Sequence, residues 1–322
     1  MAFFQSHLQE VRKIKDLHEL SRFEDCLAHV YVERCVVEQD AKSIAIFDLN
    51  GKTPIPVANL SVLFLGPGTK ISHQAMKNLA DSGCIVFWTG EEGVRFYACG
   101  VGKGRSSRNL LLQAKLVSNP EARLKVVRKM YEKRFEEPLD TSLTLRQIRG
   151  KEGARMRDTY ARQSSTTGVP WSGREYDPKK FDFSNPINRA LTSANACLYG
   201  ICHAAIVSAG YSPGLGFIHT GLQLSFVYDV ADLYKTETAI PVSFKVVSEG
   251  DHEVERRVRI AMRDSFKATK LMGRIIADMK ECLAVPDYIS EIPETFDFDP
   301  QNLIWDPEEG VLSGGINYNS DL

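Results

Sequence analysis

Between residues 28 and 100, hydrophobic positions alternate with polar ones or form short blocks bounded by glycines. The stretches HVYVERCVVEQ and KSIAIFDLNGK are rich in Val, Ile and Tyr, and the second ends in the turn signal Asn50-Gly51. CIVFWTGEEGVRFYACG predicts two strands around a turn, and ISHQAMKNLADSG predicts a short helix that ends at Gly83. The pattern predicts a compact, mostly β domain over residues 1–100.

The spacing of apolar residues becomes helical after Gly104. RNLLLQAKLVSNPEARLKVVRKMYEKRF predicts helix on both sides of a break at Asn119-Pro120. From Pro286 onward Pro, Asp, Glu and Asn dominate, as in weakly ordered tails. Three further stretches predict helices: residues 145–163, 185–210 and 256–284. The predicted fold class is α+β: a mostly β domain, a larger all-α domain and an acidic tail, at residues 1–100, 101–285 and 286–322.

The composition is that of a soluble globular protein, with 322 residues, 43% hydrophobic and 25% charged. No apolar run approaches the roughly 20 residues that span a bilayer, and the charged N-terminus lacks the apolar stretch of a secretory signal. The seven cysteines are scattered, without a Cys-x-x-Cys pair. This pattern favours reduced thiols, so we expect a cytoplasmic protein.

The net charge of −1 hides a strong segregation of charge along the chain. Residues 101–134 carry ten Lys or Arg and two acids, a balance of +8, and residues 256–274 carry seven bases and one acid, a balance of +6. Residues 278–322 carry eleven acids and one base, a balance of −10. Such blocks indicate a body that binds a polyanion, followed by an acidic tail. The alternative is that the basic helices are simply solvated.

One candidate for chemistry is Glu152, in the predicted helix LRQIRGKEGARMRDTY. Ile148, Glu152 and Met156 are spaced by four, so the carboxylate shares a helix face with two apolar residues. A charged group near a core requires compensation. Arg149 and Arg155 lie within one turn, so a buried Glu–Arg ion pair is an alternative to a functional site.

A second group of candidates lies in GFIHTGLQLSFVYDVADLYK. SFVYDVADLYK predicts a helix with Ser225 as its N-cap, and Asp229 and Asp232 are neighbours on it at i and i+3. His219 precedes it in a loop. Each residue alone has a structural interpretation, as a satisfied histidine or as a partner of the helix dipole. Together, an imidazole and carboxylates from separate segments suit Mg²⁺ or Mn²⁺ better than zinc.

The motifs RGKEGAR, GFIHTG and SFVYDVADLYK, in this order on a helical domain behind a β domain, resemble the CRISPR adaptation integrase, which inserts new spacers into the array. LKVVRKMYEKRF, PGTKISHQA, GVRFYACG and SGREYDP extend the resemblance over about residues 14–285 and point to the type I-E branch. It implies a homodimer that joins a small dimeric adaptation partner. The complex would hold double-stranded DNA with single-stranded 3′ ends and act on the CRISPR repeat.

The resemblance also implies a site in the all-α domain. Glu152, His219 and Asp232 would be the ligands of Mg²⁺ or Mn²⁺, and Asp229 an adjacent catalytic acid. A 3′-hydroxyl of the captured DNA would attack a phosphodiester at the repeat boundary. The residues predicted to contact DNA are Arg95, Lys103, Arg105, Arg108, Arg128, Arg149, Arg155, Trp171, Arg174, Tyr176, Tyr199, Tyr228, Lys235 and Arg259. For the loop that carries Trp171, packing on the domain surface is an equal alternative.

Two other functions fit the sequence. A structure-selective nuclease for branched DNA would use the same metal site but transfer the phosphoryl group to water. A non-catalytic nucleic-acid scaffold would need only the basic segments. The acidic residues argue against the scaffold, because carboxylates beside a bound phosphate repel it.

Overall fold

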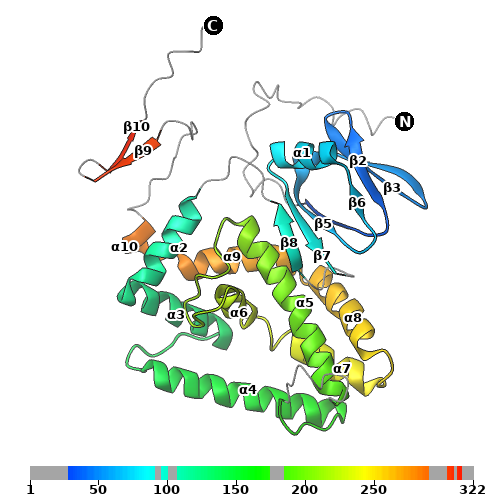
Figure 1. Cartoon of the computed structure of the whole chain (residues 1–322). Helices are drawn as coiled ribbons and strands as arrows, with labels where there is room; N and C mark the ends of the chain where they lie inside the picture. The colour runs from blue at the N-terminus through cyan, green and yellow to red at the C-terminus, as the bar shows by residue number, and fades with distance from the viewer. Residues whose placement is uncertain are drawn as a thin grey trace, which may run out of the picture.

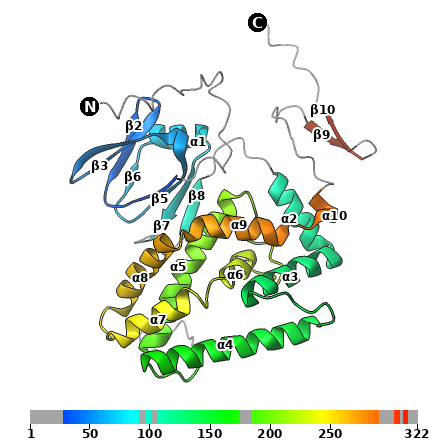
Figure 2. The ribbon, with the colours of Figure 1, turned by 180° about the vertical axis from the view of Figure 1, so that it is seen from behind.

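The computed structural model describes residues 28–90, 96–100, 107–174, 185–289, 303–307 and 310–313. Two β-sheets and one helix come first along the chain, and a group of helices follows (Figures 1 and 2). The α+β fold class predicted from the sequence is confirmed. The boundary predicted between residues 100 and 101 adjoins residues outside the described ranges, so it stays a prediction.

The first sheet has the strand order β1-β5-β7-β8, built from Ala28–Val32, Leu60–Leu65, Ile85–Thr89 and Phe96–Gly100. Side chains alternate between its faces, as strand geometry requires. Val62 and Phe87 pack with the helical core, whereas Leu63 and Val86 pack into a second core on the opposite face. Because both faces of β5 and β7 are covered, these two strands are apolar at nearly every position, whereas the edge strand β8 is largely exposed.

The second sheet has the order β4-β3-β2-β6. Its strands are Gly51–Ile55, Ser43–Asp48, Val36–Asp40 and Lys70–Ile71. The hairpin between β3 and β4 turns at Leu49-Asn50, and Gly51, with a φ of 113°, begins β4 opposite Asp48. Helix α1 (His73–Asp81) is capped by Ser72, and its buried Ala75 and Leu79 join the core of this domain. The predicted short helix is confirmed, and the predicted turn is present one residue before the Asn50-Gly51 pair.

The helical part consists of α2 (Arg108–Ser118), α3 (Pro120–Phe135), α4 (Leu145–Thr167), α5 (Pro186–Ser208), α6 (Ser225–Ala231), α7 (Ala239–Ser248), α8 (Val254–Ala268), α9 (Leu271–Leu283) and α10 (Pro286–Ile289). Helix α5 is the central element, packed against α6, α7, α8 and α9. It is long and apolar enough to cross a membrane by length and composition, but 61% of its apolar window is buried in the protein, as in a core helix.

The β-domain and the helices share one hydrophobic core. Phe96 on β8 packs on His203 of α5, with 3.9 Å between ring centroids, and Phe87 lies behind Phe96 at 5.7 Å. Burial lowers the pKa of His203 to about 4, so this ring is neutral at physiological pH. The first sheet thus packs against the central helix α5.

Four details differ from the sequence-based predictions. The helix predicted over residues 225–235 ends at Ala231, so Asp232 lies in the turn that follows α6. The stretch 256–284 is two helices, because Lys270 adopts a φ of 49° between α8 and α9. The tail contains an antiparallel pair, β9 (Leu303–Asp306) with β10 (Gly310–Ser313), where no strand was expected. Ser225 does not cap α6; Leu224 is the N-cap, and the Ser225 hydroxyl bonds the backbone N–H and C=O of Leu222 instead.

Candidate active site

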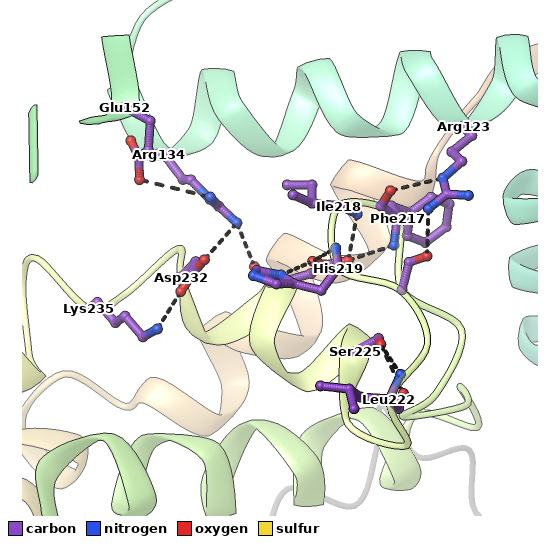
Figure 3. A network of polar contacts seen from close by, with 12 residues as sticks. Arg123, Arg134, Glu152, Phe217, Ile218, His219, Leu222, Ser225, Asp232 and Lys235 are labelled. Carbon is purple, nitrogen blue, oxygen red and sulfur yellow. Dashed lines mark hydrogen bonds and ion pairs between the residues drawn. The ribbon is translucent and has the colours of Figure 1, made fainter. Parts of the chain in front are cut away.

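Asp229 anchors the site from inside the protein. It lies on α6 with no exposed surface. Its Oδ2 accepts hydrogen bonds from the backbone N–H groups of Phe217 (2.6 Å) and Ile218 (3.0 Å). Its Oδ1 accepts from the backbone N–H of His219 (2.9 Å) and lies 2.7 Å from Nδ1 of the same ring. These four bonds compensate the buried charge and fold the loop around the carboxylate. Figure 3 shows the loop residues Phe217, Ile218 and His219 that make them.

The contact with Asp229 also sets the state of His219. The hydrogen bond to the Asp229 carboxylate raises the pKa of His219 above its usual 6.5, against the opposing effect of burial. When the neutral ring donates from Nδ1, the lone pair resides on Nε2. The side chain is 43% exposed, so the ring is fixed on one edge and open to solvent elsewhere. This is how proteins commonly orient a histidine that binds a metal.

Helices α2 and α3 hold the loop that carries His219. Gln113 is fully buried; its amide donates to the carbonyls of Ser212 (3.0 Å) and Leu215 (2.9 Å) and accepts from the N–H of Ser212 (2.7 Å). Arg123 donates from Nε to the carbonyl of Phe217 (2.9 Å). The enclosed part of the loop backbone, before residue 220, therefore has hydrogen-bond partners.

Glycine is required at position 216 of this loop. A Cβ built there would lie 2.7 Å from Cβ of Ser225 and would also collide with the carbonyl of His219. The neighbours are backbone or short side chains, which cannot move aside easily.

Glu152 and Asp232 meet on either side of a buried arginine (Figure 3). Arg134, only 3% exposed in the last turn of α3, places its guanidinium 3.9 Å from Glu152 and 3.4 Å from Asp232. Arg155 contacts Glu152 from the other side at 3.4 Å. The ion pair expected as an alternative for Glu152 is thus present, and its principal buried partner is Arg134.

Lys235 completes the charge around Asp232. Its ammonium lies 2.6 Å from the Asp232 carboxylate and 5.2 Å from the ring centroid of Tyr199. Burial opposes the charged form of Lys235, but the Asp232 charge outweighs it, and the pKa of Lys235 is raised. Tyr199 meets Tyr228 edge to face at 5.0 Å, and Tyr228 lies 5.9 Å from His219. Two tyrosines and a lysine predicted to contact DNA therefore border the site.

Other residues predicted to contact DNA are fixed by the protein itself. Arg128 donates to the carbonyls of a loop, at 2.9 Å for Thr141. Trp171 stacks on Tyr160 at 4.3 Å, as the packing alternative expected. Arg174 bonds the carbonyl of Asn188 at 2.9 Å. The remaining members are Arg149, exposed on α4; Arg108 and Arg259, half-buried on α2 and α8; and Arg95, Lys103, Arg105 and Tyr176, which lie outside the described residues.

Part of the basic block is neutralised by the C-terminal helices. Lys125 pairs with Asp287 at 2.7 Å, and Lys133 pairs with Asp278 at 3.0 Å and with Glu281. The balance of +8 therefore overstates the positive charge that α3 offers to a ligand. The first acidic residues of the segment 278–322 thus contact basic residues of α3.

The donors fit a divalent ion in kind. Glu152, His219 and Asp232 offer carboxylate oxygens and one imidazole nitrogen, which suit Mg²⁺ or Mn²⁺. A guanidinium already lies between the two carboxylates, so the space between them favours positive charge. Within the described part of the chain, no three His, Cys, Asp or Glu side chains are grouped closely enough to hold one ion. Binding of a divalent ion would therefore require the three donors to move closer together, into the space that the Arg134 guanidinium now fills.

Comparison with known proteins decides the family. A family model described as "CRISPR associated protein Cas1" matches residues 28–140 and 133–266. This chain belongs to the Cas1 family. The matches span the β-domain and most of the helices, including every residue of the site just described. The type I-E branch predicted from the motifs stays a prediction.

Cas1 relatives match most of the chain. A protein of Thermus thermophilus named "CRISPR-associated endonuclease Cas1 2" is 47% identical over 314 residues, 97% of this chain and 96% of the relative. The Escherichia coli protein named "CRISPR-associated endonuclease Cas1" is 41% identical over 261 residues, covering 81% and 86%. A solved structure named "Crystal structure of TtCas1-DNA complex" has a TM-score of 0.76 at 49% identity and covers 83% of this chain and all of its own.

Three supporting residues of the Cas1 site were missed from the sequence: Gln113, Arg123 and Arg134. A signal for two of them was present. Arg134 lies at i+3, i+4 and i+7 from the buried residues Tyr131, Met130 and Val127, so it occupies the apolar face of α3. Gln113 likewise lies one turn before the buried Leu116. A polar residue on an apolar face requires a partner inside the protein.

Proposed function

We propose that this chain is a metal-dependent DNA integrase, which joins a 3′-hydroxyl of a short captured duplex to a phosphodiester of the CRISPR repeat. The observation that carries the proposal is that Glu152 and Asp232 share Arg134, which also bonds the carbonyl of Asp229, the buried residue that fixes the imidazole of His219. Membership of the Cas1 family supports it. Mg²⁺ or Mn²⁺ would be held by these three side chains.

The reaction forms one P–O bond to the attacking 3′-oxygen and breaks one P–O bond in the repeat, which releases a new 3′-hydroxyl. When bound, the metal ion supplies a Lewis acid that stabilises negative charge on the phosphoryl oxygens. Asp229 keeps the His219 ring oriented with Nε2 directed outward. Lys235, held beside Asp232, adds a positive charge that favours a bound phosphate.

DNA would bind across the surface around the site. One similar protein has been solved as a complex with DNA. Tyr199 and Tyr228 lie beside His219 and Lys235 and offer ring faces and edges to unpaired bases at a 3′ end. Arg149 and Arg155 of α4 lie on the Glu152 side, where they would contact the phosphate backbone. Homodimerisation and a small dimeric partner protein belong to the same proposal.

A nuclease is the second candidate, because the relatives are named endonucleases. Both functions use the same site and differ only in the nucleophile, a DNA hydroxyl or water. A gel assay with a labelled duplex and an unlabelled supercoiled plasmid that carries the repeat separates them. Integration transfers the label to the plasmid, whereas hydrolysis nicks the plasmid and leaves it unlabelled.

Substitutions test which residues do the chemistry. Glu152→Gln, His219→Gln and Asp232→Asn each remove one donor while keeping most of the side-chain volume, so label transfer should stop while duplex binding persists. A control is Lys77→Gln, an exposed residue of α1 that pairs with its neighbour Asp81, far from the site. Near-normal transfer by two of the three site variants at saturating Mn²⁺ would contradict the assignment.

A further inference from the structure

Arg134 is the most deeply buried charge at the site that the proposed reaction does not use. It lies in the last turn of α3, and its side chain is 3% exposed. Its guanidinium also donates to the carbonyl of Asp229 (3.2 Å), near the C-terminal end of α6. A carbonyl at this end of a helix lacks an intrahelical partner, so the contact ties α3 to α6. Arg134 therefore touches three segments that build the site.

The pairing of Arg134 is loose for so buried a group. Its contacts with Glu152 and Asp232 are 3.9 and 3.4 Å, whereas a strong charge-assisted pair is about 2.7–2.9 Å. Its Nε is buried without a hydrogen-bond partner. A purely structural arginine would normally satisfy its donors, because a buried unpaired N–H costs free energy. Here the guanidinium is shared between two carboxylates and fully satisfied by neither.

The two carboxylates need a cation between them. Glu152 comes from α4 and Asp232 from the turn after α6, and like charges that share a site destabilise each other. Arg155 and Lys235 each approach only one of the two carboxylates, from the outside. Arg134 is the cation that the structure places between them (Figure 3).

We propose that Arg134 is the resident counter-ion of Glu152 and Asp232, which keeps the two carboxylates together in the metal-free chain and competes with the divalent ion for them. This inference rests on the proposed function, because it takes both carboxylates as metal ligands. Metal binding is then an exchange in which the guanidinium leaves at least one carboxylate. Arg134 is a positioning residue, and its positive charge weakens the intrinsic affinity of the site for metal.

The first test measures Mn²⁺ binding to the DNA-free chain by calorimetry and by the shift in melting temperature. Arg134→Met keeps the length and apolar contacts of the side chain but removes the charge. By Coulomb's law, at the effective dielectric constant of a protein site, a positive charge as close to the carboxylates as Arg134 should change their affinity for Mn²⁺ by more than a factor of about ten. Arg134→Met should therefore bind Mn²⁺ at least tenfold more tightly than the parent chain and melt at a lower temperature in EDTA.

Two variants serve as controls. Arg134→Lys keeps the charge, so its Mn²⁺ affinity should stay within a few-fold of the parent value. Arg128→Met removes a charge from the same helix, but Arg128 donates to backbone carbonyls rather than to the site carboxylates. This variant should lower the melting temperature without tightening Mn²⁺ binding.

A second test needs no metal. In EDTA, urea unfolding of a double-mutant cycle compares Arg134→Met alone with Arg134→Met in the Asp232→Asn background. Arg134→Met should raise the unfolding equilibrium constant at least tenfold less in that background, because Asp232 is already neutral there. If Arg134→Met unfolds outright, Arg134→Gln, which also removes the charge but keeps hydrogen-bonding groups, replaces it in both tests. Additive effects, or Mn²⁺ binding to Arg134→Met that is no tighter than in the parent chain, would overturn the inference alone. A parent chain that binds no Mn²⁺ and joins no DNA would overturn the proposed function as well.

Discussion

Replacing Asp229 with asparagine would remove the buried charge that orients His219 while keeping the shape of the side chain. The amide has one oxygen and one NH₂ group, whereas all four groups that bond the carboxylate lie at donor positions. If the NH₂ group took the place of Oδ2, it would face the N–H groups of both Phe217 and Ile218. In the place of Oδ1 it faces only one backbone N–H, together with a ring nitrogen that can become an acceptor. We therefore expect the second orientation.

The second orientation has a predictable cost. The bond from the His219 N–H to the carboxylate is lost and that N–H is left facing a donor, while the bonds of Phe217 and Ile218 become bonds to a neutral oxygen. A hydrogen bond to a charged group contributes about 1.5–3 kcal/mol, and an unsatisfied buried donor costs about 1–3 kcal/mol. We expect Asp229→Asn to lower the free energy of unfolding by about 2–4 kcal/mol. Domains are typically stable by about 5–15 kcal/mol, so the variant should still fold.

The chemical consequence is larger than the loss of stability. With an NH₂ group opposite Nδ1, the neutral His219 ring carries its proton on Nε2, and the lone pair needed by a metal ligand faces the amide instead. Chemical denaturation measures the stability change, and proton–nitrogen correlation spectra of ¹⁵N-histidine-labelled protein report the tautomer. We expect Nε2–H in the variant, together with lost DNA joining. An unchanged tautomer, or normal joining with the proton on Nε2, would refute this role of Asp229.

Three further outcomes follow from the geometry. Asp229 raises the pKa of His219, so the stability lost in His219→Gln should be greatest below about pH 6.5 and should shrink as the pH rises through the raised pKa. Urea unfolding between pH 5 and 8.5 measures this loss, and a loss that does not vary with pH would contradict the prediction. Gly216→Ala should destabilise the chain and abolish joining. Gly150→Ala on α4 is its control, because an added Cβ there has no atom within 4 Å, and in thermal melts it should be neutral or stabilising by up to about 1 kcal/mol. Equal effects of the two changes would be evidence against the tight loop. The tail combines a charge balance of −10 over residues 278–322 with aromatic residues such as Phe296 and Trp305, as in segments that order on a partner surface. Deleting residues 290–322, which spares the contact of Asp287 with Lys125, should therefore abolish co-purification of the small partner protein and leave duplex affinity unchanged. Tighter DNA binding with the partner still attached would instead make the tail an autoinhibitor.

The sequence was enough to predict the fold class because its signals are local. Alternation of apolar residues, the Asn50-Gly51 turn and the Asn119-Pro120 break each act over a few residues, and the structure has the corresponding elements. The break between α8 and α9 has no such signal. Lys270 adopts a left-handed conformation that neither its own side chain nor its neighbours favour, so packing must impose it.

The candidate site was only partly predictable for a related reason. Glu152, His219, Asp229 and Asp232 are each unusual where they stand, since each places a polar group beside apolar residues. The pairing of Glu152 with Arg134 joins α4 to α3 across a long separation in the chain. The basic run that contains Arg134 suggested a surface for phosphates, yet the helix turns this one residue inward. Its spacing from the apolar residues Val127, Met130 and Tyr131 is the one signal that distinguishes it from its neighbour Lys133.

The central claim is that the nucleophile is a DNA 3′-hydroxyl. The most direct measurement compares two labelled duplexes, one ending in a 3′-hydroxyl and one in a 3′-deoxy sugar, incubated with the chain, Mn²⁺, the partner protein and a supercoiled plasmid that carries the repeat. An integrase should join the first duplex to the plasmid, and with the second duplex it should leave the plasmid intact and unlabelled. Equal cleavage of the plasmid with both duplexes would show that water is the nucleophile and would contradict the central claim.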